Sequence, residues 1–486
     1  MAMIGVAAIF RRLTDPRSNL TLEAGMDWTG GGEMGRKHVV LTMLSMTIAL
    51  CLTACPARER GPQPAFGPRT GAWSLADGRI VAIAPSSDGA LRWRTLDGRT
   101  ARLEGDGASE TATTGWSTEA DAIPLTFGDG ARGLISFDRQ TATRLELDVV
   151  ETRFESRGET LAGRLVLPRG GLAAPILVEV HGSERSSALT YNPMQQLGPA
   201  SGVGVFVYDK RGTGGSTGAY TQDFSVLAQD GAAAVREARR LAGTRAGRVG
   251  LHGGSQGGWV APLAAGLTPV DFVIVGFGLA ESPLEENRAE TIQDVAEAGF
   301  DADAQRKAGE LADAAGVVIA SRYRSGYAEL DRLRRLYGDE PWYAHATGEF
   351  TGELARYPSW TIRLVGPSRD VGTSWNHQSE PPLRALDAPL LWMLAGADRS
   401  APPERTRALL TRLIGEGRHI TLADFPDTDH GITNFRPGAN GERLQTGYAS
   451  GYFTMILDFA LDRPLAAGAY GNAVLTGAST RGRPPE

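Results

Sequence analysis

Apolar and polar positions divide the chain from about residue 150 onward into buried strands and helices. Continuous apolar runs, several ending in glycine, alternate with longer Ala-, Arg- and Glu-rich segments such as 223–241. The apolar runs are 176–183, 203–209, 249–254, 271–278, 389–396 and 420–426. Strands that are apolar throughout and alternate with helices form a parallel sheet with both faces covered. The pattern therefore predicts an α/β fold, a mostly parallel sheet flanked by helices.

The segment before this region has a different pattern. From residue 71 to about 143, short apolar or alternating runs are separated by Asp-Gly pairs. These pairs are Asp77-Gly78, Asp88-Gly89, Asp97-Gly98 and Asp129-Gly130. Asp-Gly between such runs indicates tight hairpins, so we predict a small antiparallel sheet or sandwich that supports or partly covers a site. The segment is too short for a propeller, which needs about 40 residues per blade. Residues 144–168 then predict a hairpin turning near Arg157-Gly158.

One stretch, Val249–Trp259, combines a strand, a glycine turn and the start of a helix. The pattern Gly-x-Ser-x-Gly spans residues 253–257, with Ser255 at its centre. A sharp strand-to-helix turn lifts a serine hydroxyl out of the sheet edge, and small residues on both sides avoid clashes. The free N–H groups at the start of the following helix favour a developing negative charge. The alternative interpretation is a glycine-rich surface turn that contains a serine.

Composition narrows the classes of function. The chain has 486 residues, enough for one large domain and a smaller one, and its 42% hydrophobic and 22% charged residues are typical of a globular protein. The formal net charge is −6 without a concentrated basic patch, so we expect no nucleic-acid partner. Cysteine occurs only at Cys51 and Cys55, which excludes a disulfide framework or a cysteine metal site elsewhere.

Both cysteines lie in a segment with the order of an export signal. A basic patch at 36–38 precedes an apolar run, 39–52, that is shorter than the about 20 residues of a membrane span. Leu52-Thr53-Ala54-Cys55 follows, and the whole segment resembles a bacterial lipoprotein signal with its lipobox. The alternatives are a plain secretory signal or a buried apolar helix.

The lipoprotein resemblance implies where the mature chain begins and where it resides. Cys55 would be lipidated and become the first residue, and translation would begin at Met34, so that residues 1–33 precede the true start. Residues 56–70 are rich in Pro, Gly and Arg and predict a flexible tether. The expected location is the bacterial cell envelope, periplasm or cell surface, with a lipid anchor in a membrane. One acyl chain binds a membrane only weakly, so stable attachment needs more than one.

Several motifs between residues 150 and 465 together resemble the α/β-hydrolase superfamily. They are His181-Gly182-Ser183, the segment Asp209 to Ser216, Gly253 to Gly258, the strand and Gly-x-Asp at 389–398, and the Asp-His-Gly loop at 429–431. Within the superfamily the chain is similar to the serine esterase, dienelactone hydrolase and prolyl-oligopeptidase-like group. The motifs are specific for the superfamily and say little about the substrate.

The resemblance assigns roles to individual residues. Asp398 is the expected orienting carboxylate and His430 the expected base, which gives the chain order Ser, Asp, His of this fold. The backbone N–H of Gln256, with that of Ser183 or Gly182, is the expected oxyanion hole. Two other histidines are expected elsewhere: His181 in the oxyanion loop and His252 in a structural place within the nucleophile strand. Asp209-Lys210-Arg211 is expected to be a structural turn, and Asp427 and Asp429 solvated loop acids.

The remaining segments complete the predicted domain organisation. The catalytic domain is expected over 144–465, interrupted at about 282–382 by a helical cap whose first long helix starts near Asp301. Such a cap excludes water and shapes the pocket. Its bulky side chains either line the pocket or form the cap core: Trp342, Tyr343, Trp360, Trp375 and His377. A closing helix is predicted near 447–459, and residues 466–486 are predicted to form a disordered tail.

These observations support three functional hypotheses. The first is a serine hydrolase that cleaves small acyl esters through an acyl-enzyme, without metal or organic cofactor. The second is a serine peptidase or amidase, which would need a propeller or an amine-anchoring acidic pair that the sequence does not reveal. The third is a surface lipoprotein that binds a ligand without catalysis, which the complete triad argues against. Oligomeric state, acyl length and natural substrate stay open.

Overall fold

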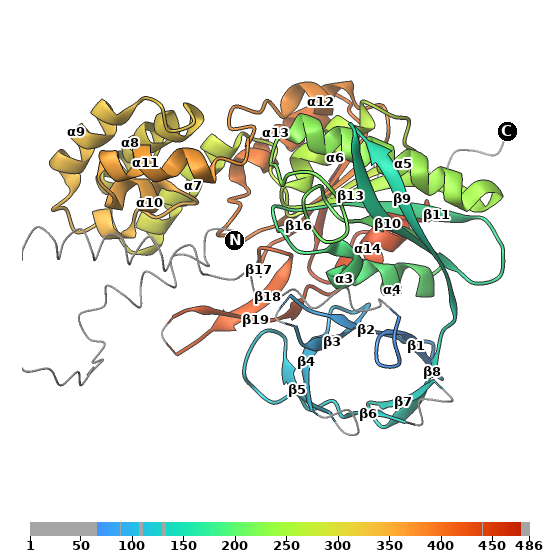
Figure 1. Ribbon diagram of the computed structural model, residues 1–486. Helices are drawn as coiled ribbons and strands as arrows, with labels where there is room; N and C mark the ends of the chain where they lie inside the picture. The colour runs from blue at the N-terminus through green and yellow to red at the C-terminus, as the bar shows by residue number, and fades with distance from the viewer. Residues whose placement is uncertain (1–65, 88, 106–109, 129–132, 440, 478–486) are drawn as a thin grey trace, which may run out of the picture. The chain divides into compact units, whose positions relative to one another are not determined.

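The computed structural model describes residues 66–87, 89–105, 110–128, 133–439 and 441–477 (Figure 1). The expected signal segment with Cys55 lies outside these residues, as do most of the expected tether, Asp88, Asp129 and Gly130. The first described strands form an antiparallel closed barrel, and a nine-stranded mixed sheet with helices on both faces follows. The predicted α/β fold with a small N-terminal β region is confirmed.

The N-terminal β region is closed, which the sequence did not predict. Its strands are β1 Gly71–Leu75, β2 Ile80–Pro85, β3 Leu91–Thr95, β4 Thr100–Gly105, β5 Glu110–Thr114, β6 Leu125–Phe127, β7 Leu134–Phe137 and β8 Gln140–Arg144. β1 pairs with β8 as well as with β2, so the predicted small antiparallel sheet closes into a barrel and does not form a sandwich. Closure leaves no edge strand with unpaired backbone groups. Trp73, Trp93 and Phe137 fill the interior.

The main sheet has the strand order β20-β16-β15-β14-β13-β11-β12-β10-β9. Its strands are β9 Leu147–Ser156, β10 Glu159–Pro168, β11 Ala174–Val180, β12 Gly204–Tyr208, β13 Ala246–Gly254, β14 Val273–Gly276, β15 Leu390–Ala395, β16 Ile420–Phe425 and β20 Val474–Gly477. The strands from β12 to β16 run parallel, and the predicted hairpin is the antiparallel pair β9–β10 at one edge. Because the central strands are parallel, the loops after β11, β13, β15 and β16 emerge at one end of the sheet.

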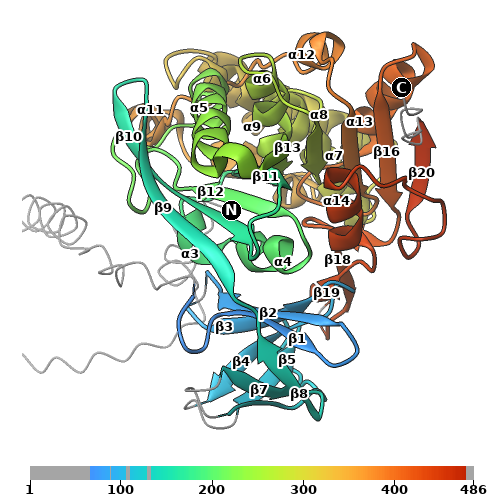
Figure 2. The same cartoon turned by 90° about the vertical axis from the view of Figure 1, so that its right-hand side faces the viewer.

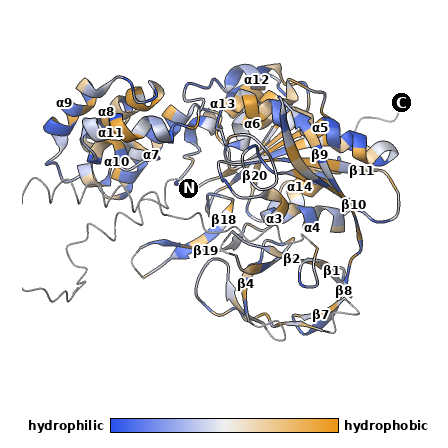
Figure 3. Cartoon of the chain, viewed as in Figure 1, coloured by the Kyte–Doolittle hydropathy of each residue, from blue (hydrophilic) through white to orange (hydrophobic). Residues whose placement is uncertain are grey.

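Helices cover both faces of this sheet (Figure 2). α5 Phe224–Ala242, α6 Gly257–Ala265 and α13 Glu404–Gly415 pack on one face. α3 Ala188–Tyr191, α4 Met194–Ala200 and α14 Tyr452–Ala460 pack on the other. The strands at the centre of the sheet carry hydrophobic colour in Figure 3. The two buried layers hold the strand ends, and hence the loops that follow them, in fixed positions.

The predicted cap is a group of helices between β14 and β15 (Figure 1). Its helices are α7 Pro283–Glu297, α8 Ala302–Ala320, α9 Tyr327–Tyr337, α10 Thr351–Arg356 and α11 Ser359–Arg369, with the 3₁₀ turn η2 Tyr343–His345. The next helix, α12 Glu380–Ala385, lies beside α6 instead, and its Leu383 belongs to the core of the main sheet. Another 3₁₀ turn, η1 Gly243–Arg245, precedes β13. Ser282 and Glu285 form a capping box at the start of α7, and Asp301 caps α8 as expected. Trp342 is buried in the cap core, whereas Trp360 is 69% exposed.

The C-terminal segment differs from its prediction. A three-stranded sheet, β17 Thr428–Asp429, β18 Thr433–Pro437 and β19 Arg443–Tyr448, precedes α14, which begins at Tyr452 rather than near residue 447. The expected disordered tail was wrong for residues 474–477, because they pair as β20 with the edge strand β16. Within the described part of the chain, no helix is both long and apolar enough to cross a membrane.

Candidate active site

Ser255 occupies the sharp turn between β13 and α6. Its φ of 52° lies in the left-handed region, a conformation that costs a non-glycine residue about 1–3 kcal/mol. Two backbone hydrogen bonds hold it there: Ser255 N–H donates to Gly276 O at 3.0 Å, and Gly258 N–H donates to Ser255 O at 2.8 Å. The turn therefore has the strained geometry expected of a nucleophilic serine.

The glycines around Ser255 are required because a Cβ atom at these positions would clash with neighbouring atoms. A Cβ on Gly253 would lie 2.7 Å from the Gly257 carbonyl oxygen, and one on Gly257 would lie 3.1 Å from the Val180 carbonyl oxygen. A Cβ on Gly254 would lie 2.6 Å from the Phe277 ring. The glycines of the motif thus allow the first turn of α6 to pack directly on the ends of β11 and β13.

The loop after β11 lies beside the nucleophile. The Cβ position of Gly182 is 3.6 Å from the Ser255 Cβ, which places the 181–183 loop next to the turn. Gln256 begins α6 as its N-cap residue. Within the part of the chain that is described, neither the Gln256 N–H nor the Ser183 N–H donates a hydrogen bond. Two free donors beside a serine are the arrangement that an oxyanion hole requires.

Asp398 and His430 come together from two different loops. Asp398 follows β15 and is 1% exposed, and its Oδ2 lies 2.9 Å from His430 Nδ1. The second oxygen, Oδ1, accepts the backbone N–H groups of Ser400 and Ala401, both at 2.9 Å. Burial lowers the pKa of His430, but the Asp398 carboxylate outweighs it and leaves that pKa above its ordinary value. The two residues that the sequence predicted as acid and base are therefore in direct contact.

Phe277 connects the nucleophile turn to the base, a role that the sequence gave no reason to assign. Its ring lies against Gly254 and packs edge-on to the His430 ring at a centroid distance of 5.0 Å. The residue follows β14 with φ 43°, and its N–H donates to Met393 O at 2.8 Å. Gly254, next to Ser255 in the turn, and His430 therefore lie against the same aromatic side chain. A positive φ at a bulky residue has no sequence signal, because tertiary packing imposes it.

Asp429 differs from the solvated acid that was expected. It is 8% exposed, and its Oδ1 accepts the backbone N–H groups of Arg399 and His430 and lies 3.0 Å from an Arg443 nitrogen. It therefore ties the base loop to the acid loop. Asp427 is exposed as expected, with a hydrogen bond from Asn472 at 3.3 Å.

The other histidines lie apart from the acid–base pair. His252 is buried opposite Glu179 of β11, with its Nδ1 3.1 Å from both carboxylate oxygens, as a structural histidine within the sheet would be. His181 is buried at the end of β11, with Nδ1 3.5 Å from Glu184 Oε1. Neither contact involves Asp398, so neither histidine competes with His430 for that carboxylate.

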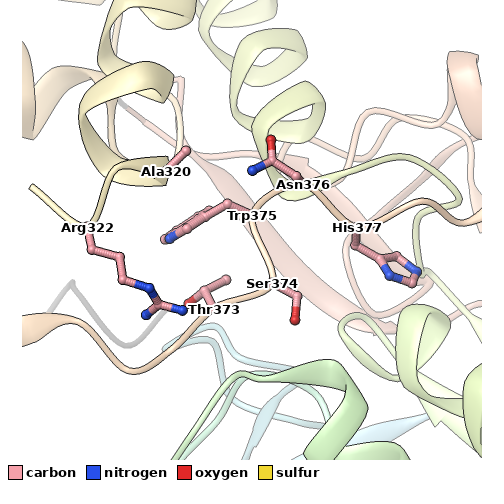
Figure 4. Close-up of a pocket in the computed structure, with 7 residues that line it drawn as sticks. All are labelled: Ala320, Arg322, Thr373, Ser374, Trp375, Asn376 and His377. Atoms are coloured by element: carbon pink, nitrogen blue, oxygen red, sulfur yellow. The ribbon is translucent and has the colours of Figure 1, made fainter. Parts of the chain in front are cut away.

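A pocket of about 400 Å³ lies between the end of α8 and the segment 373–377 (Figure 4). Its lining residues are Ala320, Arg322, Thr373, Ser374, Trp375, Asn376 and His377. Neither Asp398 nor His430 lines this pocket. Residues 371–374 form hydrogen bonds with residues 221–224. Burial lowers the pKa of His377 to about 4, so this imidazole is neutral. Two of the bulky cap residues, Trp375 and His377, thus line this pocket.

Among the described residues, no group of three or more His, Cys, Asp or Glu side chains could hold a metal ion. One end of the sheet carries a serine at a strained turn, an imidazole held by a buried carboxylate, and free backbone donors beside the serine. These are the elements of nucleophilic acyl transfer.

Comparisons with solved structures return proteins of low identity, a peptidase and an esterase among them. The acylaminoacyl peptidase of Pyrococcus horikoshii is 15% identical over 74% of this chain and 51% of its own, with a TM-score of 0.36. An esterase of Pyrococcus furiosus is 14% identical over 59% of this chain and 83% of its own, with a TM-score of 0.38. A hypothetical protein of Pseudomonas aeruginosa is 16% identical over 65% and 94%, with a TM-score of 0.37. The chain spans about half the length of the first of these.

Likeness at these identities and scores says nothing about the substrate. No curated protein matches the sequence. The family model described as alpha/beta hydrolase family matches residues 177–440, more than half of the 486 residues, and covers Gly182, Ser255, Asp398 and His430. The chain therefore belongs to the alpha/beta hydrolase family.

Proposed function

We propose that the protein is a serine hydrolase that cleaves carboxylic esters of small molecules through an acyl-enzyme. The observation that carries the proposal is the contact between His430 Nδ1 and the buried Asp398 carboxylate at 2.9 Å, at the same end of the sheet as Ser255 with its φ of 52°. Membership of the alpha/beta hydrolase family supports hydrolysis as the reaction class.

Each step moves one proton between named atoms. His430 Nε2 takes the Ser255 hydroxyl proton as Oγ attacks the ester carbonyl, and Asp398 stabilises the imidazolium. The N–H groups of Gln256 and Ser183 bind the tetrahedral oxyanion, and losing one such donor costs about 3–4 kcal/mol. Collapse expels the alcohol, which receives the proton from His430. Water then attacks the acyl-enzyme with His430 again as base, and the acid and free Ser255 are released.

The ester function is favoured over peptide hydrolysis by what the N-terminal region contains. The peptidase hypothesis needs a propeller or an amine-anchoring acidic pair, and the propeller is absent from this region, because the described residues from Gly71 to Arg144 form a closed eight-stranded barrel.

Two matched sets of substrates test this proposal. Purified protein should hydrolyse p-nitrophenyl esters and leave aminoacyl p-nitroanilides largely intact, and Ser255→Ala should remove the ester activity. Anilides cleaved faster than esters would replace the proposal with a peptidase. Equal ester rates for wild type and Ser255→Ala would contradict it altogether.

We also propose that Cys55 anchors the enzyme to a membrane of the bacterial cell envelope. The support is the basic, apolar and small-residue order of positions 36–55 in the sequence. In bacteria that express the full chain, wild-type protein should sediment with membranes, and Cys55→Ser should release it. Equal sedimentation of the two proteins, with no lipid adduct found by mass spectrometry, would exclude the anchor.

A further inference from the structure

The oxyanion loop is held by two side chains from the segment after β12. Lys210 Nζ donates to the Gly182 carbonyl oxygen at 2.7 Å, and the Tyr220 hydroxyl donates to the Ser183 carbonyl oxygen at 2.6 Å. Nζ also lies 5.0 Å from the centre of the Tyr220 ring, a cation–π distance. Consecutive carbonyls of one loop are therefore fixed by two neighbouring donors.

The hydrogen bonds from Lys210 and Tyr220 end on two different peptide units of the loop. The Gly182 carbonyl and the Ser183 N–H belong to the same peptide unit, so a cation on that oxygen draws electron density away from the Ser183 N–H. Hydrogen bonds in series strengthen one another by perhaps 10–30% per bond in condensed phase. The Ser183 carbonyl bound by Tyr220 belongs instead to the peptide unit of the Glu184 N–H. Lys210 thus acts on the peptide whose N–H is the proposed oxyanion donor, whereas Tyr220 acts on the next one.

Burial of the Lys210 ammonium group at this position is energetically unfavourable. It is 2% exposed, and an ammonium group buried without full compensation costs several kcal/mol. Burial lowers the pKa of Lys210 to about 8, and the nearby Glu184 carboxylate partly opposes the shift. The turn that carries Lys210 is rigid, because its carbonyl oxygen accepts both the N–H and the hydroxyl of Thr213, at 2.9 and 2.7 Å. A structural turn alone would not need a charged side chain aimed at a carbonyl of the oxyanion loop.

We propose that Lys210 is a positioning residue of the oxyanion hole, which holds the Gly182–Ser183 peptide and strengthens its N–H as a donor to the transition state. The proposal rests on the serine hydrolase function proposed above. It replaces the expectation that residues 209–211 form only a structural turn. The ligand of the strengthened donor is the tetrahedral oxyanion itself, so Lys210 should affect kcat and leave ground-state binding nearly unchanged.

Lys210→Met tests this role, because it removes the charge and donor and keeps an unbranched side chain. Its kcat for p-nitrophenyl butyrate should fall about 10- to 100-fold, less than the 10²–10³-fold typical of a deleted donor, with KM nearly constant. Inhibition by a trifluoromethyl ketone, whose adduct with serine carries an oxyanion, should weaken by the same factor. Lys210→Arg restores a cation and should recover most of both losses.

Tyr220→Phe is the matched control. It removes the bond to the Ser183 carbonyl, which fixes the loop without acting on the Ser183 N–H. Its loss of kcat should be smaller than that of Lys210→Met, and its ketone affinity should not fall in parallel. The inference is overturned if Lys210→Met has wild-type kcat. It is equally overturned if kcat and KM change together, ketone affinity is unaltered and Lys210→Arg gives no rescue.

A pH profile tests the same claim in variants that keep a cation. The charged and titratable groups facing Lys210 are Glu184 and Arg185 of the loop and Tyr220, whose pKa is raised above 10.0 by burial. Wild-type kcat should therefore decline as pH rises through about 8, where Lys210 loses its proton. Lys210→Arg stays charged and should lack this decline. Coincident alkaline limbs would refute the inference even if Lys210→Met fails to fold.

One labelling control separates this inference from the function on which it rests. Wild-type protein that reacts with a fluorophosphonate probe retains the proposed nucleophile, whatever Lys210→Met does. Absence of labelling in the wild type would overturn the serine hydrolase proposal and the inference together. Labelling combined with an unchanged kcat in Lys210→Met would overturn only the inference.

Discussion

Replacement of Asp398 by Asn should lower kcat, because of the hydrogen bonds that this carboxylate makes. Oδ1 accepts two backbone N–H groups, from Ser400 and Ala401, and lies 3.2 Å from His430 Nδ1, whereas Oδ2 is the nearer oxygen to Nδ1, at 2.9 Å. An amide at this position keeps its oxygen toward the two N–H groups, because the reverse orientation would place NH₂ against two donors. Its NH₂ must then face His430 Nδ1.

The consequence is a change of tautomer at the base. Nδ1 must accept the new N–H, so the imidazole proton moves to Nε2, which can then no longer take the Ser255 proton. A wrong tautomer of this kind typically lowers kcat by about 10⁴-fold, or about 5 kcal/mol in activation free energy. Because both backbone hydrogen bonds of Oδ1 survive, Asp398→Asn should still fold.

The assay is steady-state hydrolysis of p-nitrophenyl butyrate, with circular dichroism as the test of folding. Asp429→Asn is the matched control, since Asp429 adjoins His430 in sequence but binds the backbone N–H groups of Arg399 and His430 rather than the imidazole. It should lower kcat far less than Asp398→Asn does. A folded Asp398→Asn with kcat within about tenfold of wild type would refute Asp398 as the orienting acid.

Three further outcomes follow from the structure. The pKa of His430 is raised above 6.5 and the base must be neutral, so kcat/KM should rise with pH through a pKa above 6.5; a midpoint below it would contradict this. Arg211→Met leaves the fully buried Asp230 without its ion-pair partner and should lower the free energy of unfolding by about 3–5 kcal/mol, with kcat of the folded fraction unchanged. In urea unfolding, Gly98→Ala should lower the free energy of unfolding more than Gly78→Ala does. Both glycines have positive φ, but only at Gly98 would the new Cβ lie 2.4 Å from a backbone carbonyl oxygen of β19. Equal losses of stability in the two variants would argue against that contact.

The parts of the site that were predictable from sequence depend on local chain geometry. The turn at Ser255 needs small residues at fixed offsets, so its signature lies within one short stretch. Asp398 and His430 each follow an apolar strand, and strand order in this fold brings such loops to one end of the sheet. Their contact at 2.9 Å agrees with that expectation.

The parts that were missed depend on pairing between distant segments. β20 is a short, half-exposed strand that pairs with β16 across more than forty residues of chain, and such partners leave no local pattern. Barrel closure likewise requires β1 to meet β8. Asp429 looks like a solvated acid because its backbone donors and Arg443 come from other loops. The hydrogen bond from Lys210 to Gly182 joins residues 28 positions apart, so the sequence around Lys210 indicates only a turn.

The identity of the nucleophile is the claim from which the rest of this account follows. Wild-type protein treated with a fluorophosphonate, digested and analysed by mass spectrometry should carry one adduct, on the peptide that contains Ser255. Ser255→Ala should carry none. An adduct on another serine, or an unlabelled wild type that is folded, would contradict the account.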